Sequence, residues 1–364
     1  MSEIRKLDRF LGCFLGGAVG DALGYPVEFI DEKSICRGYG DGGIRTLDQA
    51  GNPAIITDDT QMTLFNMNGL LYALTNEKPI FPSVWLAHRE WLGTQGDKSR
   101  MDNKKKAHMW LYDQDVLHAR RAPGISCLTA IRGSVHGGTI EDPVNNSKGC
   151  GSIMKAAPFG LFLKYQQDTD PEDYLRSVYD LSARLSAQTH GHPLGYFSGG
   201  YLALLLARIV HLEPGANGRV EDAIKKVRMG DSDWEQELTA GAAKAVALAL
   251  DPSVSDLDGI HALGEGWVAE EALYISLFCA VRYQDDFAAA IRCAVNHKGD
   301  SDSTGAICGN ILGAWLGVQT VEKCFDTSLL DAENLVREMT EDFYRAVEFG
   351  VPQGDLNWDG KYRR

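Results

Sequence analysis

The stretch that decides the fold is residues 10–24, FLGCFLGGAVGDALG, in which glycine recurs at every fourth position. Residues 305–317, GAICGNILGAWLG, repeat this spacing near the other end of the chain. A glycine inside a helix costs about 0.5–1 kcal/mol relative to alanine, so eight of them need compensation from closely packed backbones. We expect each glycine stripe to lie against another helix in the centre of the protein. The two stripes face each other, or each faces a third helix.

Apolar residues recur at three- and four-residue spacings along most of the chain, while the alternation typical of strands is scarce. The pattern therefore predicts one compact all-α domain over residues 1–364. The Gly/Asp-rich segment 38–54 and the charged segment 96–124 are predicted to be long connections, which often carry function. The predicted helices cover residues 7–24, 60–75, 82–95, 125–133, 151–165, 172–187, 192–212, 220–228, 234–250, 267–282, 285–297, 303–317 and 330–348.

The composition argues against some classes of binding partner and favours one cellular compartment. The 364 residues carry a formal net charge of −14, which argues against general binding to nucleic acid or to an anionic membrane. We expect no apolar stretch to reach the roughly 18–20 residues of a membrane span. The eight cysteines form no CxxC pair and no zinc-site spacing, which suits the reducing cytoplasm.

Two short acidic clusters, at residues 57–60 (TDDT) and 299–304 (GDSDST), combine carboxylates with hydroxyls. Such oxygen ligands are those that Mg²⁺ and Mn²⁺ prefer. If the fold brings the clusters together, each pair of like charges about 4 Å apart costs about 4 kcal/mol at an effective dielectric near 20. The repulsion in several such pairs would cancel much of a domain's usual stability of about 5–15 kcal/mol. A shared site would therefore need bound cations, two of them if all the ligands are used.

A simpler interpretation is available for either cluster alone. Aspartate and threonine are preferred N-cap residues, and acidic side chains in the first turn interact favourably with the helix dipole. Both clusters precede a predicted helix. The matched composition of the two clusters favours a shared metal site, but capping remains the alternative.

An ordered series of motifs resembles the ADP-ribosylglycohydrolase family over about residues 10–320. The series is GGAVGDALG at 16–24 with Glu28, TDDT at 57–60, KGCGSIMK at 148–155, Thr189-His190, and GDSDS at 299–303. The resemblance implies a compact orthogonal helical bundle with two Mg²⁺ or Mn²⁺ ions at the bottom of a cleft. The ligands that it implies are Thr57, Asp58, Asp59, Asp300, Asp302 and Ser303, with Thr304 as a weaker alternative oxygen.

The resemblance also implies catalytic and substrate-binding residues. Glu28 is the candidate for moving protons at the leaving group, and Asp97 is a second candidate with which Asp102 competes. Residues Lys148, Gly149, Cys150, Gly151 and Ser152 are predicted to begin a helix whose N-terminus and backbone N–H groups hold a diphosphate. An ordinary glycine-rich turn is the alternative for this stretch. The resemblance places His190 near the substrate and away from the metal.

The resemblance implies a metal-dependent hydrolase that removes ADP-ribose from ADP-ribosylated protein, with arginine as the preferred acceptor, and the cysteine pattern favours the cytoplasm. ADP-ribose is then a product, and an ADP-ribosylating toxin or transferase makes the modification that it reverses. The alternatives are an enzyme acting on O-linked (serine) or small-molecule ADP-ribose, or a non-enzymatic immunity or binding protein on the same fold. A dinuclear phosphohydrolase is disfavoured, because neither acidic cluster contains the histidine ligands usual at such sites.

Overall fold

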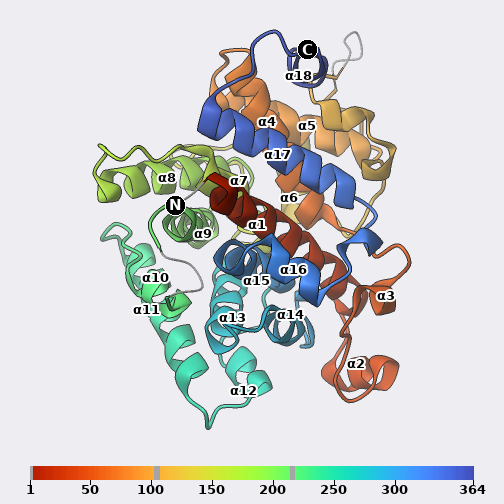
Figure 1. Ribbon diagram of the computed structural model, residues 1–364, viewed down its shortest axis with the longest axis vertical. Coiled ribbons are helices and arrows are strands. Elements are labelled where there is room, and N and C mark those ends of the chain that lie inside the picture. The colour runs from red at the N-terminus through yellow and green to blue at the C-terminus, as the bar shows by residue number, and fades with distance from the viewer. Residues whose placement is uncertain (1–2, 102–106, 214–217) are drawn as a thin grey trace.

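The computed structural model describes residues 3–101, 107–213 and 218–364, which form a single helical domain (Figure 1). Within these ranges the regular elements are all helices. The only strand-like pairings there are two isolated backbone bridges, one between Ala54 and Leu330 and one between Gly149 and Val268. The all-α fold predicted from the sequence is therefore confirmed.

The helices vary in length from single turns to the long α1 near the N-terminus. In chain order they are α1 (Glu3–Gly24), α2 (Glu32–Tyr39), α3 (Leu47–Ala50), α4 (Asp58–Thr75), α5 (Ile80–Thr94), α6 (Ile125–Gly133), α7 (Ala157–Phe162), α8 (Pro171–Ala187), α9 (Pro193–His211), α10 (Val220–Lys225), α11 (Asp233–Leu250), α12 (Asp256–His261), α13 (Ala269–Arg282), α14 (Phe287–Val295), α15 (Ser301–Leu316), α16 (Val318–Cys324), α17 (Glu333–Phe349) and α18 (Leu356–Tyr362).

Most predicted helices match observed ones to within four residues at each end, and one prediction is wrong. The segment 151–165 is not one helix, because a short 3-10 turn at Cys150–Ser152 precedes α7, which begins only at Ala157. The predicted connection 38–54 contains α3. Helices of one or two turns show too little periodicity to stand out in a sequence.

The two glycine stripes face each other along α1 and α15, which run antiparallel near the middle of the molecule (Figure 1). A Cβ atom on Gly20 would lie 2.0 Å from the carbonyl oxygen of Gly305, and one on Gly309 would lie 2.0 Å from that of Gly16. Gly12 and Gly313 make the next such pair along the helices. We call this contact the glycine seam. Of the two alternatives open from the sequence, direct contact between the stripes is the one observed.

The antiparallel seam determines where the functional residues lie. It places the C-terminal end of α1 beside the N-terminal end of α15, where Gly24 packs against the backbone of Ser301. After α1 the chain makes one 3-10 turn, Tyr25–Val27, and then reaches Glu28. Close backbone packing along α1 and α15 thus brings Glu28 next to the second acidic cluster.

Two apolar stretches correct one expectation from the sequence. Lys6–Val27 and Pro193–His211 are long and apolar enough to cross a membrane. In each of them, 89% of the most apolar window is buried inside the protein. Central helices of a globular core have the same property, so the absence of a membrane partner stays a prediction.

Candidate metal centre

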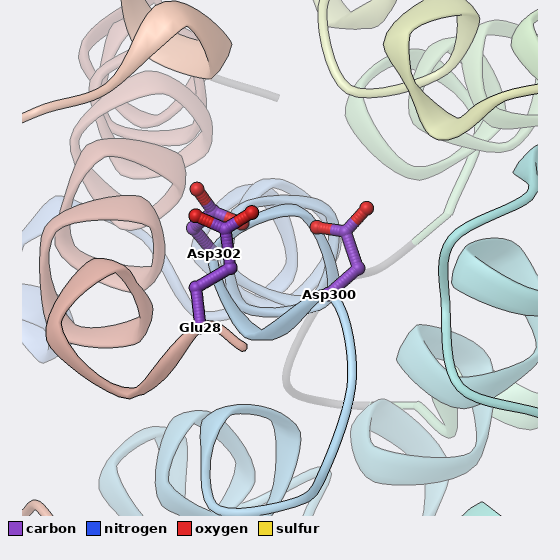
Figure 2. Close-up of side chains that lie close together, drawn as sticks. All are labelled: Glu28, Asp300 and Asp302. Carbon is purple, nitrogen blue, oxygen red and sulfur yellow. The ribbon is translucent and has the colours of Figure 1, made fainter. Parts of the chain in front are cut away.

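Three carboxylates from opposite ends of the chain lie close together, at the point where α1 ends and α15 begins (Figure 2). Glu28, Asp300 and Asp302 each offer an oxygen, and these oxygens lie within 4.8 Å of one another. Asp300 is the N-cap of α15 and accepts a hydrogen bond from the backbone of Ser303 at 3.3 Å. Asp300 therefore both caps α15 and belongs to the acidic cluster, because the N-terminus of α15 lies beside the other carboxylates.

The first acidic cluster is held by a carboxylate inside α1. Asp21 is fully buried and accepts hydrogen bonds from the backbone N–H of Thr57, at 3.1 and 3.0 Å, and from that of Thr60, at 3.1 Å. The Thr60 hydroxyl also donates to Asp21. The side chain of Thr57 caps α4 by accepting from the backbone of Asp59 at 3.3 Å. Asp21 thus fixes the N-terminus of α4 against α1.

A cavity of about 300 Å³ lies over both acidic clusters. Most of the predicted site residues line it, namely Glu28, Asp58, Asp59, Gly149, Cys150, Gly151, His190, Asp300, Asp302 and Ser303. Thr57, Lys148 and Ser152 are not among its lining residues. The fold therefore joins both acidic clusters and the glycine-rich loop at one cavity, as the shared-site interpretation requires.

The carboxylates in the cavity raise one another's pKa values. Burial, together with the charges of Asp300 and Asp58, raises the pKa of Glu28 to about 8. Burial also raises the pKa of Asp58 to about 8, although the backbone N–H of Gly124 donates to its carboxylate at 3.0 Å. Burial and neighbouring carboxylates raise the pKa of Asp59 well above its usual value. Without a positive partner, this cluster disfavours full ionisation.

The donor set fits divalent cations. One carboxylate oxygen of Glu28 and one of Asp59 are buried with no hydrogen-bond partner. Buried carboxylates without partners are costly in a protein interior, and a hard cation removes that cost by accepting their lone pairs. The other groups at hand, the hydroxyl of Ser303 and the carboxylates of Asp300 and Asp302, are oxygen ligands too.

The glycine-rich loop corrects a prediction about how a diphosphate would be held. Its N–H groups are largely used within the protein, since Gly149 donates to the Ser147 hydroxyl at 3.2 Å and Cys150 donates to the Trp267 carbonyl at 3.2 Å. Ser152 donates to the Gly149 carbonyl at 3.3 Å. The loop forms only a 3-10 turn here, and a helix N-terminus for anion binding is absent from Cys150–Ser152.

The side chains at the two ends of this loop, Lys148 and Ser152, are bonded to other protein groups. Lys148 forms an ion pair with Glu270, and the Ser152 hydroxyl donates to the Gly149 carbonyl at 3.1 Å. Neither side chain lines the cavity. The part of the loop that faces the cavity is Gly149, Cys150 and Gly151, where the small residues leave room beside His190.

Asp97 does not reach the cavity. Its carboxylate accepts from Arg132 Nε at 2.6 Å and from the backbone of Ser99 at 3.0 Å. A hydrogen bond from the Ser99 side chain, together with those from Arg132 and the Ser99 backbone, lowers the pKa of Asp97 to about 2, so the carboxylate is held ionised in a local ion pair. Its competitor Asp102 lies outside the described residues. Asp97 therefore has no part in the proposed chemistry.

Several residues at the site received no role from the sequence. Asp21 belongs to a quoted motif, but only the fold shows that it anchors α4. Phe29 and Trp267 stack at the cavity with ring centroids 5.0 Å apart and an interplanar angle of 21°. Phe29 has a positive φ of 66° and is 70% exposed, both uncommon for a large apolar residue. No local pattern connects residues 29 and 267, so the sequence could not have paired them.

Comparison with known proteins agrees with this geometry. The family model described as ADP-ribosylglycohydrolase matches residues 2–349. The ADP-ribosyl-[dinitrogen reductase] glycohydrolase of Rhodospirillum rubrum is 28% identical over 325 residues, which cover 86% of this chain and 87% of that protein. ADP-ribosylhydrolase ARH3 of Homo sapiens is 25% identical over 362 residues, which cover 89% of this chain and 90% of that protein.

A solved structure described as an ADP-ribosylglycohydrolase-related protein complex shares the fold with a TM-score of 0.59 and 22% sequence identity. The match covers 94% of this chain and 99% of that chain, so it extends over the whole helical domain. At this identity the likeness bears on the fold alone. Because the family model spans residues 2–349, the chain belongs to the ADP-ribosylglycohydrolase family, whose members are hydrolases that remove ADP-ribose.

Proposed function

We propose that this protein removes ADP-ribose from ADP-ribosylated arginine in proteins by hydrolysing the glycosidic bond at the ribose anomeric carbon. The observation that carries the proposal is the convergence of Glu28, Asp300 and Asp302 with the α4 carboxylates in one cavity. Such a concentration of buried acidic groups opposes folding unless a bound ligand offsets it. A cation-dependent activity gives these groups a function that capping alone does not.

Two divalent cations, Mg²⁺ or Mn²⁺, would be held by the first-cluster residues Thr57, Asp58 and Asp59 and by the second-cluster residues Asp300, Asp302 and Ser303. When bound, they supply Lewis-acid polarisation and orientation of ribose hydroxyls. Thr57 is the weakest member of this set, since its hydroxyl is engaged as the cap of α4 and does not line the cavity. Asp21 has no direct part, because its oxygens are occupied by the α4 backbone.

Glu28 is proposed to move the proton in the reaction. In hydrolysis the bond from the anomeric carbon to the guanidinium nitrogen breaks, and the oxygen of a water molecule bonds to that carbon. The proton released by the water must reach the leaving nitrogen. Glu28 lines the cavity, and one oxygen of its carboxylate has no partner within the described residues. Its position beside Asp300 and Asp302 therefore suits it to this proton transfer.

The preference for arginine rests on the surroundings of Glu28. Phe29, the next residue, stacks with Trp267 at the cavity that contains the acidic clusters. Flat aromatic faces beside carboxylates suit a planar cation, which gains both cation–π and ionic attraction. A serine acceptor offers neither. The natural partners on this proposal are ADP-ribosylated proteins and the toxin or transferase that modifies them.

We also propose a reducing compartment such as the cytoplasm. All eight cysteines are free, including Cys279 and Cys293, whose sulfur atoms lie 3.4 Å apart in the core. Two buried thiols at this separation are compatible with a compartment in which disulfides do not accumulate. Fractionation of cells with an antibody to the native protein would test this part.

The decisive experiment measures release of ADP-ribose from an ADP-ribosyl-arginine protein beside an ADP-ribosyl-serine peptide, with Mg²⁺, with Mn²⁺ and with EDTA. We expect release from arginine that EDTA abolishes and added metal restores. Release from serine alone would support the hydrolase activity but would contradict arginine as the acceptor. Release from neither substrate by folded, metal-loaded protein would overturn the proposal, and would favour a small-molecule substrate or a binding role.

A further inference from the structure

A chain of buried polar side chains runs from Lys155 to the cavity. Lys155 and Thr189 are fully buried and His190 is 1% exposed. Lys155 Nζ donates to Thr189 Oγ1 at 2.9 Å, and Thr189 Oγ1 lies 2.9 Å from His190 Nδ1. The order of the chain is therefore ammonium, hydroxyl, imidazole. Burying three polar groups costs desolvation free energy, and hydrogen bonds between the groups offset that cost only if each hydroxyl or ring proton has a defined acceptor.

The direction of each hydrogen bond follows from the chemistry of the donors. A lysine ammonium has donors and no acceptor, so it uses one lone pair of the threonine oxygen. The hydroxyl proton then has two possible acceptors, the His190 Nδ1 atom and the Cys127 thiol, with which Thr189 also interacts. Thiol sulfur is a weak acceptor, whereas a neutral imidazole nitrogen is a strong one. The proton of Thr189 therefore goes to Nδ1.

This direction sets the tautomer of His190. Burial and the charge of Lys155 lower the pKa of His190 well below its usual value, so the ring is neutral. A neutral ring that accepts at Nδ1 carries its proton at Nε2. Nε2 is buried, has no hydrogen-bond partner in the described structure, and belongs to a residue that lines the cavity.

Two glycines border the Nε2 edge of the ring. A Cβ atom on Gly149 would lie 3.5 Å from Nε2, and one on Gly151 would lie 3.1 Å from the adjacent Cε1 atom. The absence of side chains at these two positions leaves only backbone atoms of the glycine-rich loop beside the ring edge. Because the N–H groups of Gly149 and Cys150 are already bonded within the protein, His190 is an uncommitted side-chain donor on this side of the cavity.

We propose that Lys155 and Thr189 are positioning residues that hold His190 as the Nε2–H tautomer, and that Nε2–H donates to an acceptor oxygen of bound ADP-ribose. The ligand assignment rests on the proposed function, while the tautomer does not. The acceptor oxygen belongs either to the diphosphate or to the distal ribose. Lys155 acts on His190 through the hydrogen bond to Thr189 and through its charge, and it touches no ligand.

The first test is nitrogen-15 NMR of the histidine rings in the Mg²⁺-loaded protein, with His190 assigned by its loss in His190→Gln. We expect the Nε2–H tautomer in the wild-type protein. Thr189→Val, which removes the hydroxyl and keeps the shape, should lose that fixed tautomer, and Thr189→Ser should retain it. Thr340→Val is the matched control, because Thr340 is equally buried but donates to a helix carbonyl in α17.

The second test is calorimetric titration of the same Mg²⁺-loaded variants with ADP-ribose and with ADP. Loss of one fixed hydrogen bond predicts binding about 5- to 10-fold weaker for Thr189→Val, with Thr189→Ser and Thr340→Val within about twofold of the wild type. Weakening with both ligands places the acceptor on the diphosphate. Weakening with ADP-ribose alone places it on the distal ribose.

Two results would overturn the inference. An Nδ1–H tautomer in the wild-type protein would refute the hydrogen-bond chain, and unchanged ADP-ribose affinity in Thr189→Val would refute its role in binding. A wild-type protein that binds no ADP-ribose would overturn the ligand assignment and the proposed function together. In that case the NMR measurement still decides the hydrogen-bond chain by itself.

Discussion

The glycine seam and the acidic cavity are built from the same two helices and have opposite energetics. Along the seam, α1 and α15 pack through bare backbone, as at Gly20 and Gly305, with no charge involved. At the end of the same helices, Glu28 and Asp302 lie beside each other with raised pKa values. Close packing stabilises the first region, and like-charge proximity destabilises the second.

The difference shows how a folded protein can hold a site that opposes folding. The carboxylates cannot move apart, because the helices that carry them are locked by the seam and by the Asp21 contacts to α4. Rigid elements that hold unfavourable groups in place are typical of preorganised sites. Substitutions in the seam should therefore act on stability, and substitutions in the cavity should act on activity.

The largest effect is expected from Gly309→Ala in the seam. The added methyl group would lie 2.0 Å from the Gly16 carbonyl oxygen, and backbone atoms cannot move aside without separating the helices. We expect a loss of about 4 kcal/mol or more in the free energy of unfolding, measured by urea denaturation. The matched control is Gly38→Ala in α2, where no atom lies within 4 Å of the new Cβ. This control should be neutral or stabilising by about 0.5–1 kcal/mol. Equal stability of the two variants would show that the seam is not tightly packed.

The next effect is expected from the double substitution Asp58→Asn/Asp59→Asn in the cavity. We expect ADP-ribose release to fall by about 1,000-fold or more, since cation-based stabilisation of a transition state is worth several kcal/mol. The metal-free variant should be as stable as the wild type or more stable by about 1–2 kcal/mol, because buried charges are removed. Turnover near the wild-type rate would contradict the assignment of these ligands.

Thermal unfolding with and without metal supplies a readout of the same variant that does not depend on activity. Mg²⁺ or Mn²⁺ at about 100 times its dissociation constant should stabilise the wild-type protein by about 2.7 kcal/mol for each cation bound. The double variant should lose this stabilisation. A metal-induced shift that persists in the variant would place the cation elsewhere.

A smaller effect is expected from Asp21→Asn, at the junction of the two regions. One acceptor oxygen becomes an NH₂ group that faces the N–H donors of Thr57 and Thr60. We expect a loss of about 1–3 kcal/mol in the free energy of unfolding and, since Asp21 orients predicted ligands, about 10- to 100-fold lower activity. Asp31→Asn, at the exposed N-cap of α2, is the matched control and should leave activity unchanged. Full activity in Asp21→Asn would separate α4 anchoring from the site.

The smallest effect is expected from Asp97→Asn. Its carboxylate pairs with Arg132 outside the cavity, and partly exposed ion pairs contribute about 0–1 kcal/mol. We expect initial rates within about twofold of the wild type on ADP-ribosyl-arginine protein. A fall of tenfold or more in the rate would return Asp97 to the catalytic residues and show that this segment moves to the substrate.

Helix content and helix boundaries were largely predictable, because amphipathic periodicity is a local property. The segment after Cys150 was not, because a backbone hydrogen bond from Cys150 to the distant Trp267 carbonyl accompanies a 3-10 turn where the sequence pattern favours a helix. For the same reason the sequence did not reveal that the N–H group of Cys150 is already bonded to the distant Trp267 carbonyl. Asp97 was misplaced because its partner, Arg132, is 35 residues away in the chain.

The sequence by itself determined that two oxygen-rich clusters and two glycine stripes exist, since residue type and spacing are written in it. Only the tertiary structure decided that the stripes face each other and that Glu28 meets Asp300 at their end. It also decided that Phe29 stacks with Trp267, and that Lys155 reaches His190 through Thr189. The physical reason is that local propensity depends on neighbouring residues in the chain, whereas a cavity depends on which distant backbones can approach most closely.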